Sequence, residues 1–221
     1  MEMNLSVNEI RVLACLVEKS FSTPEYYPLT LNSLTAACNQ KSNRDPEMLL
    51  GEKEIVRALD SLRDRKMVWA VTLAGSRVPK YRHSLPEVIP LSPPQLAVLC
   101  ELMLRGPQTV GELRTRASRL FTLSGVDEVQ GILKELSDWP GGPLAGVAPR
   151  RAGQREERYA HLLGGPLPVE PESALPPSEP ARLSVMAEND RIAALETRVA
   201  SLEDELARLK AQFADFAKQF Q

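Results

Sequence analysis

In this 221-residue chain, the side chains that can take part in the widest range of reactions are those of three cysteines and two histidines. Cys15, Cys38 and Cys100 occur inside helical patterns, with no CxxC pair and no histidine close by in the sequence. This spacing does not match a metal site or a disulfide framework. We therefore interpret all three as reduced core residues, since a free cysteine packs like a small apolar side chain. We expect no metal and no cofactor.

The two histidines, His83 and His161, occupy matched places in two Tyr-x-His-x-Leu segments. A catalytic histidine needs a nucleophile or a second titratable group within reach, and neither segment supplies one. The sequence also lacks a phosphate-binding loop, a metal-ligand pattern and a nucleophile motif. We predict that the protein is not an enzyme and that both histidines have a structural role on strands.

Phosphate binding is the other chemistry that the residue types permit. Seven basic residues fall in a predicted loop, helix and hairpin, where they could share one surface; these candidate nucleic-acid-binding residues are Lys41, Arg44, Lys53, Arg57, Arg77, Lys80 and Arg82. The net charge of this region is small, because residues 1–88 hold 12 Lys/Arg against 11 Asp/Glu. Nucleic-acid affinity rests on neutralising several phosphates, so the prediction depends on these cations converging.

The elements that would position these residues follow the order of a winged helix, which is three helices and a two-stranded hairpin. A capping box from Ser6 to Glu9 begins the first helix, and Thr30 caps the second. Apolar residues at helical spacing predict a third helix from about Glu52 to Lys66. The β-rich runs MVWAVTL and PKYRHSL, joined by AGSRV, predict the hairpin.

The same order of elements recurs further along the chain. Ser92 to Gln95 and Thr109 to Glu112 are capping boxes, EVQGILKEL parallels EIVRALDSL, and RYAHLL parallels KYRHSL, at offsets of 86, 79, 74 and 78 residues. We predict two tandem winged-helix domains, residues 1–88 and 89–165, in a mainly α fold with small β-hairpins (α+β).

The third helix of the second copy carries an excess of carboxylates. Its charged residues are Asp127, Glu128, Lys134, Glu135 and Asp138. An acidic helix is repelled by phosphate, so we expect any nucleic-acid affinity to reside in the first domain.

The C-terminal region predicts a different architecture. Residues 166–182 form a proline-rich linker. Residues 183–221 form a predicted coiled-coil helix whose dimerisation residues, at heptad positions a and d, are Ile192, Leu195, Val199, Leu202, Leu206, Leu209, Phe213, Phe216 and Phe220. Opposite charges flank this seam, which favours a parallel homodimer. The alternative is a single amphipathic helix folded back onto the winged domains.

The compartment follows from what the chain lacks. No apolar run approaches the roughly 20 residues that cross a bilayer, and the N-terminus is too acidic and polar for a signal peptide. We expect a cytoplasmic protein with no membrane association.

The run from Phe21 to Pro46, FSTPEYYPLTLNSLTAACNQKSNRDP, resembles the signature of the YceH-like family of bacterial proteins of unknown function. The tandem winged helices and the C-terminal helix fit this resemblance. It implies a fold and a bacterial cytoplasmic setting, with no activity or binding residues to carry over. The long loop of residues 39–51, between the second and third helices, departs from a bare winged helix and is either a contact surface or a packing device.

Two classes of function remain open. The first is a dimeric regulator that binds nucleic acid, with double-stranded DNA as the partner that the domain type suggests, through the basic residues of domain 1. The second is a protein–protein interaction or scaffold module without nucleic-acid binding, which the acidic helix of the second domain favours.

Overall fold

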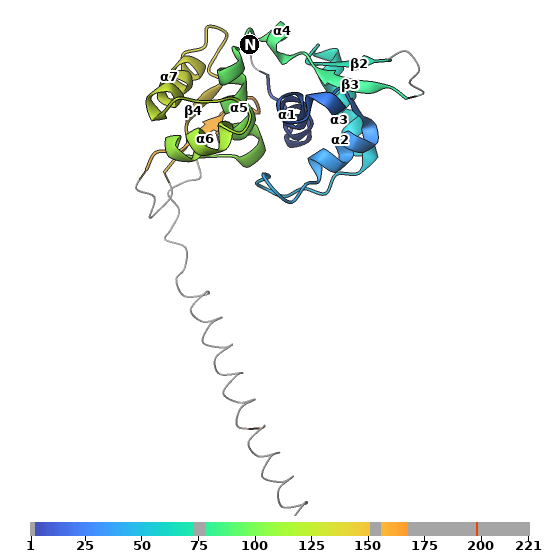
Figure 1. The fold of residues 1–221 in the computed structure, drawn as a ribbon, viewed down its shortest axis with the longest axis horizontal. Coiled ribbons are helices and arrows are strands. Elements are labelled where there is room, and N and C mark those ends of the chain that lie inside the picture. The colour runs from blue at the N-terminus through green and yellow to red at the C-terminus, as the bar shows by residue number, and fades with distance from the viewer. Residues whose placement is uncertain (1–2, 73–77, 151–155, 168–197, 199–221) are drawn as a thin grey trace, which may run out of the picture. The chain divides into compact units, whose positions relative to one another are not determined.

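The computed structural model describes residues 3–72, 78–150, 156–167 and 198. We define residues 3–88 as the first repeat and residues 89–165 as the second repeat. The elements of the first repeat are α1 (Val7–Ser22), a 3-10 turn (Pro24–Tyr26), β1 (Leu29–Thr30), α2 (Leu31–Cys38), α3 (Glu52–Asp64), β2 (Val68–Val71), β3 (Lys80–His83) and α4 (Leu85–Val88) (Figure 1).

The second repeat has the same order of three helices and a hairpin. Its elements are α5 (Pro93–Arg105), α6 (Val110–Ala117), α7 (Val126–Ser137), β4 (Ala145–Val147) and β5 (Tyr159–His161). The described residues are thus mainly helical with small antiparallel sheets, which confirms the predicted α+β class. None of the described helices is both long and apolar enough to span a membrane.

Helix starts are set by local capping, as the sequence predicted. Ser6 accepts from the amide of Glu9 while the Glu9 carboxylate accepts from the amide of Ser6, so two free amides of the first turn are satisfied. Thr109 and Glu112 make the same exchange at α6. The amide of Ser33 donates to the Thr30 hydroxyl at the start of α2. These bonds place the helix starts where the sequence indicated them.

The sheets are small and antiparallel. In the first repeat the strand order is β1-β3-β2, with Leu29 opposite Tyr81 and Trp69 opposite Arg82. In the second repeat β4 pairs with β5, and Ala145 lies opposite His161. Strand β1 and helix α4 were not predicted, because segments of two and four residues are too short to show a period.

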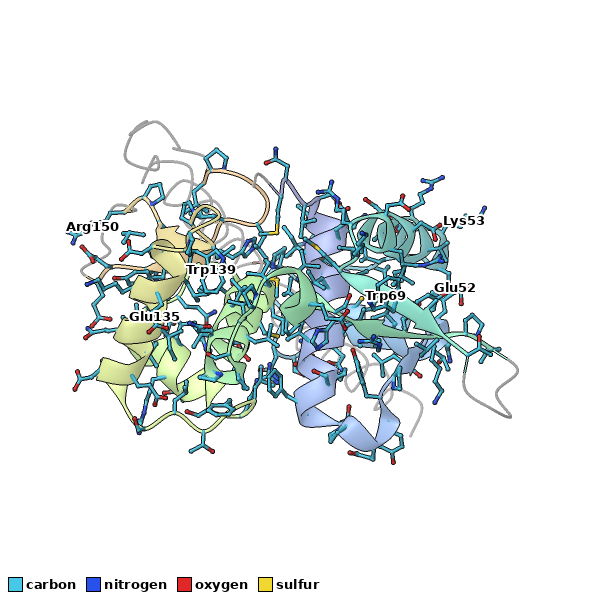
Figure 2. The ribbon with its side chains drawn as sticks, turned by 90° about the horizontal axis from the view of Figure 1, so that it is seen from above. Glu52, Lys53, Trp69, Glu135, Trp139 and Arg150 are labelled. Atoms are coloured by element: carbon cyan, nitrogen blue, oxygen red, sulfur yellow. The ribbon has the colours of Figure 1, made fainter. Side chains whose placement is uncertain are left out.

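One apolar core includes residues of both repeats, with α1 and α5 at its centre. Every residue of α1 from Glu9 to Glu18 is buried, because α5 covers one face of α1 and α3 covers another. The amide of Leu5 donates to the carbonyl of Leu163 at 2.8 Å and so joins the start of the first repeat to the end of the second. Figures 1 and 2 both show α3 and α7 on opposite sides of the α1–α5 pair.

The compact unit that holds both repeats is Met1–Glu170. The proline-rich segment after Leu167 and the predicted dimerisation residues lie outside the described residues, and of the predicted coiled coil the structure describes Arg198 alone, which is helical and exposed. The coiled coil and the homodimer therefore stay predictions.

Candidate functional site

The outward face of α3 carries the exposed cations that the sequence assigned to this helix. Lys53 and Arg57 are one helical turn apart and exposed, and neither side chain forms a hydrogen bond or ion pair within the described residues. Ile55, Leu59 and Leu62 of the same helix are buried, as the helical spacing predicted. The burial of that apolar stripe fixes which side of α3 faces outward.

Carboxylates share the exposed surface of α3. Glu52 and Asp64 are exposed at its two ends, and Glu54 accepts from the amide of Gly51 at 2.8 Å. Asp60 forms an ion pair with Arg63 at 3.2 Å. Among the described residues the unpaired positive charge of α3 is therefore limited to Lys53 and Arg57, and Val56, between them, is 37% exposed.

The prediction that Arg44 binds nucleic acid is wrong. Its side chain is fully buried and forms an ion pair with Glu18 at 2.5 Å. It also donates to the carbonyl of Ala37 at 2.9 Å and to the side-chain oxygen of Gln40 at 3.1 Å. A guanidinium with these partners and no exposed surface cannot reach a phosphate, so Arg44 belongs to the core.

The other predicted cations are distributed unevenly. Lys41 is exposed, Lys80 is half-buried on β3, and Arg77 lies outside the described residues. Arg82 forms an ion pair with Glu87 at 3.0 Å, and Glu87 also accepts from the indole nitrogen of Trp69 at 3.3 Å. Lys41, Lys53 and Arg57 are therefore the exposed members of the predicted set that lack a partner in the described part of the chain.

The loop of residues 39–51 acts as a packing device between the repeats. At its ends, the Asn39 side chain exchanges two hydrogen bonds with the backbone of Leu50, at 2.7 and 2.9 Å. In its middle, the amide of Asp45 donates to the carbonyl of Leu104 at 2.9 Å, and Arg105 donates to the Asn43 side chain at 2.8 Å. The loop is thus attached both to itself and to the end of α5, which supports the packing alternative and leaves Lys41 exposed.

A charge network built on the buried carboxylates of Glu18 and Glu101 links the repeats. Arg119 of the second repeat pairs with Glu18 of α1 at 2.8 Å and with Glu101 of α5 at 2.6 Å. Burial alone would raise the pKa of Glu18, but the hydrogen bond and charge of Arg44 outweigh it and hold that pKa below its ordinary value. Glu18 is consequently ionised and shared between Arg44 and Arg119.

Sequence reasoning missed Arg11, Glu18 and Glu101 as buried charges and Arg119 as their partially exposed neighbour in the network. A signal existed for the first two, because Arg11 and Glu18 are seven residues apart and so lie on one helix face, within a run that is apolar on every side. No local signal existed for Arg119, whose partners come from α1 and α5.

Both histidines lie on strands, in line with the predicted structural role. His83 Nε2 and the Ser20 hydroxyl are 3.1 Å apart, and the amide of His83 donates to the Tyr27 hydroxyl. Burial lowers the pKa of His83 and of His161 to about 4 in each case, so both rings are neutral near pH 7. The three cysteines are buried free thiols, as predicted.

The second repeat presents an acidic surface at the matching helix. Asp127, Lys134, Glu135 and Asp138 of α7 and its C-terminal cap are exposed. On the hairpin, Arg150 is exposed but pairs with Glu157 at 3.3 Å. Figure 2 shows Glu135 and Arg150 at the end of the molecule opposite Lys53.

Comparison with known proteins gives a family and no activity. The family described as "Protein of unknown function, DUF480" matches residues 5–154. UPF0502 protein GSU0233 of Geobacter sulfurreducens is 53% identical over 221 residues, which cover 100% of both chains. A UPF0502 protein of Geobacter metallireducens is 56% identical over 224 residues, again 100% of both chains. UPF0502 protein PBPRB0676 of Photobacterium profundum is 42% identical over 89% of this chain and 90% of its own.

These matches confirm the expected membership of a bacterial family of unknown function. They cover both repeats, and the two Geobacter relatives align with this chain over its whole length. The chain belongs to the DUF480 (UPF0502) family.

Proposed function

We propose that this chain is a non-enzymatic, tandem winged-helix protein that binds double-stranded nucleic acid through its first repeat. The winged-helix assignment is supported by the order of three helices and an antiparallel hairpin in both repeats. The observation that carries the binding proposal is the pair Lys53 and Arg57, exposed and unpartnered within the described residues on the third helix. In helix-turn-helix folds this helix is the one that enters the major groove.

The binding is expected to be weak and directed at phosphates. Three exposed, unpartnered cations, Lys41, Lys53 and Arg57, are available in the described part of the first repeat. Each neutralised phosphate contributes a slope of about −0.9 in log affinity against log salt, so three cations give at most about −2.7 per protomer. The acidic α7 is excluded from such contacts by charge repulsion.

A homodimer formed through residues 183–221 would strengthen this binding. Two weak sites on one particle bind with an effective concentration set by the linker, and so gain affinity without new contacts. The support for the dimer is the unbroken heptad pattern in the sequence.

The test is fluorescence anisotropy of labelled duplex DNA with the full chain, from low to moderate salt. Lys53→Glu should weaken binding at least tenfold at low salt and flatten the salt dependence. The matched control is Lys134→Glu, which reverses an exposed lysine on α7 and should leave affinity unchanged. Equal losses in the two variants would mean that net charge, and not the α3 surface, governs binding.

A second function is favoured by one specific observation, the contact of Trp69, Arg82 and Glu87. Trp69 is 40% exposed, and the side chains of Trp69 on β2 and Arg82 on β3 both donate hydrogen bonds to Glu87 of α4. Tryptophan and arginine are enriched at energetically dominant positions of protein interfaces. If the intact chain binds no duplex even at low salt, docking of a partner protein on this face becomes the better proposal.

A further inference from the structure

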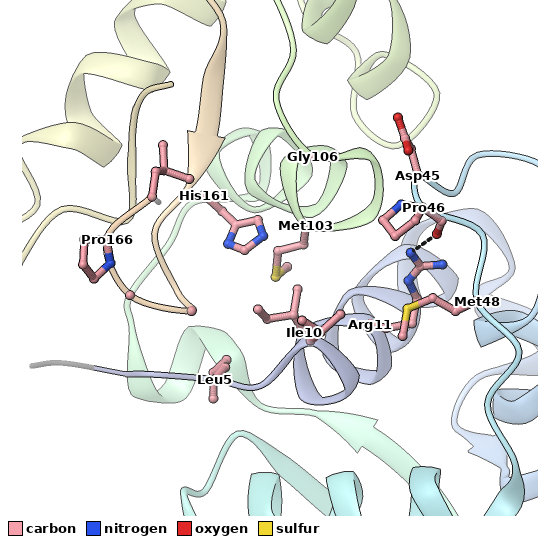
Figure 3. A pocket seen from close by; sticks show the side chains of 14 residues that line it. Leu5, Ile10, Arg11, Asp45, Pro46, Met48, Met103, Gly106, His161 and Pro166 are labelled. Atoms are coloured by element: carbon pink, nitrogen blue, oxygen red, sulfur yellow. Dashed lines mark hydrogen bonds between the residues drawn. The ribbon is translucent and has the colours of Figure 1, made fainter. Parts of the chain in front are cut away.

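A cavity of about 280 Å³ lies where the two repeats meet. Its walls come from the segment before α1, from α1, from the loop of residues 39–51, from the end of α5, and from β5 with the residues that follow it (Figure 3). This volume is near the lower end of the range for small-molecule pockets, which suits a ligand of few atoms.

The body of the cavity is apolar. Leu5, Ile10, Met48 and Met103 line it, and Figure 3 shows Ile10 and Met103 between Arg11 on one side and His161 on the other. Apolar walls favour a ligand with a hydrocarbon portion, because its transfer out of water is favourable. Methionine side chains also adapt to ligands of differing shape.

Arg11 brings a buried positive charge to one side of this cavity. The residue is 2% exposed, and its two terminal nitrogens donate to the backbone carbonyls of Cys38 at 3.4 Å and Pro46 at 2.6 Å. Its Nε is buried and has no hydrogen-bond partner in the described structure. Among the described residues no carboxylate forms an ion pair with Arg11, so this guanidinium has an unused donor and no direct partner to balance its charge, on which Glu18 acts only at longer range.

The nearest acidic residue of the cavity lining does not supply that balance. Asp45 is exposed, and Figure 3 shows its carboxylate directed away from Arg11. Burial lowers the pKa of Arg11, which reflects a desolvation cost that a bound anion would reduce.

His161 provides a second unused polar atom on the opposite side. Its Nδ1 is buried and has no partner, and Figure 3 shows the ring beside Met103. A neutral imidazole donates from one nitrogen and accepts at the other, so His161 can meet either kind of ligand group.

We propose that this cavity binds a small organic acid, with its carboxylate at the Arg11 guanidinium and its hydrocarbon chain along Ile10 and Met103. A carboxylate is favoured over a phosphate because Arg11 is the single Lys or Arg among the lining residues, whereas a phosphate dianion is commonly held by several cationic donors. The site is independent of the nucleic-acid surface, since it contains neither Lys53 nor Arg57.

The first experiment is calorimetric titration of the full chain at pH 7 with acetate, butyrate, hexanoate and octanoate, each compared with its primary amide. We expect at least one acid of four to eight carbons to bind with a submillimolar Kd, and its amide to bind at least tenfold more weakly. Equal affinity of acid and amide would overturn the proposal, and so would the absence of acid binding below about 10 mM. The tenfold ratio is the order of magnitude expected when a charged hydrogen bond is lost.

The second experiment locates the ligand without altering the cavity. The chain has two histidines, so the imidazole NMR signals are assigned by comparison with His83→Gln. The acid that binds most tightly should shift the His161 signals and leave those of His83 unchanged. Binding without a shift at His161 would place the acid elsewhere and contradict the proposal.

The third experiment blocks the cavity. Met48→Trp adds volume at a half-buried lining residue and should reduce affinity for the acid at least tenfold. Leu49→Trp is the matched control, because Leu49 is 91% exposed, adjacent in sequence and absent from the lining, and this variant should bind normally. Arg11→Met should also abolish binding, but Arg11 supports the loop through Pro46 and this variant is checked for folding first. Normal affinity in Met48→Trp would contradict the proposed location.

Discussion

The thiol of Cys100 donates to the carbonyl of Ala14 at 3.4 Å, and these residues are 86 positions apart in the sequence. The same offset relates Ser6 to Ser92, the residues that cap the first helix of each repeat. Helices α1 and α5 therefore touch at equivalent positions, as two subunits do at a two-fold interface. The repeats are joined face to face rather than arranged as independent units along the chain.

This contact predicts that both repeats unfold together. Each repeat contains one of the two tryptophans, Trp69 in the first and Trp139 in the second, so fluorescence can follow each repeat separately. In each of the variants Trp69→Phe and Trp139→Phe, the fluorescence of the remaining tryptophan should show a single urea transition. Calorimetry of the same variant should show a single thermal transition. Two separate transitions within one variant would contradict the shared core.

The crossing of α1 and α5 should tolerate no added volume. Ala14 is fully buried at the contact with Cys100. Ala14→Leu is expected to destabilise the unit by about 1–3 kcal/mol, the usual cost of overpacking. Ala36→Leu, at an exposed position of α2, is the control and should change the free energy of unfolding by less than about 0.5 kcal/mol. Urea unfolding measures both.

Removing Arg44 should cost far more stability than removing Lys41. In Arg44→Met the carboxylate of Glu18 loses its closest partner while it remains buried, and breaking a buried pair in this way costs about 3–5 kcal/mol. In Lys41→Met an exposed side chain is lost, with an effect within about 0.5 kcal/mol. A loss of DNA affinity in Arg44→Met without a change in stability would reinstate Arg44 as a binding residue.

The histidines predict how stability depends on pH. Burial lowers the pKa of His83 and His161 to about 4 in the folded chain, against about 6.5 when unfolded. The unfolded state therefore takes up protons first as the pH falls, so this contribution is complete above about pH 6.5 and is lost towards pH 4. His83→Gln should flatten the stability profile in that window, measured by urea unfolding, while DNA affinity stays unchanged. A collapse of affinity at unchanged melting temperature would reveal a binding role.

Deleting residues 183–221 should convert a dimer into a monomer with both repeats still folded. The expectation rests on the heptad pattern and on the compact unit Met1–Glu170, which ends before the deleted segment. Light scattering with size-exclusion chromatography measures the mass, and circular dichroism checks the fold. A truncated chain that remains dimeric would assign the interface to the repeats.

The sequence predicted what local interactions determine. The capping residues Ser6, Thr30 and Thr109, the inward side chains of α3 and the strand positions of both histidines follow from hydrogen bonds and periodicity within a few residues. Strand β1 was missed because two residues show no alternation.

The candidate site was predicted less well, because burial of a charged loop residue depends on distant segments. Arg44 is polar by type and lies in a polar run, but α1 supplies Glu18 and α5 supplies Leu104 to hold its loop in place. Arg11 likewise acquires its surroundings from Pro46 and from residues near His161. These partners are far apart in the sequence, so no local pattern contains the information.

The position of α1 at the centre of the core also affects how the chain is made on the ribosome. The face of α1 that α5 covers is synthesised more than 70 residues before α5 begins at Pro93, and Leu5 pairs with Leu163. At about 5–20 residues per second, several seconds pass between the two events. During that interval Ala14, which Cys100 of α5 contacts in the folded chain, lacks this neighbour, so the nascent first repeat exposes apolar surface of α1 until translation delivers the helix that covers it.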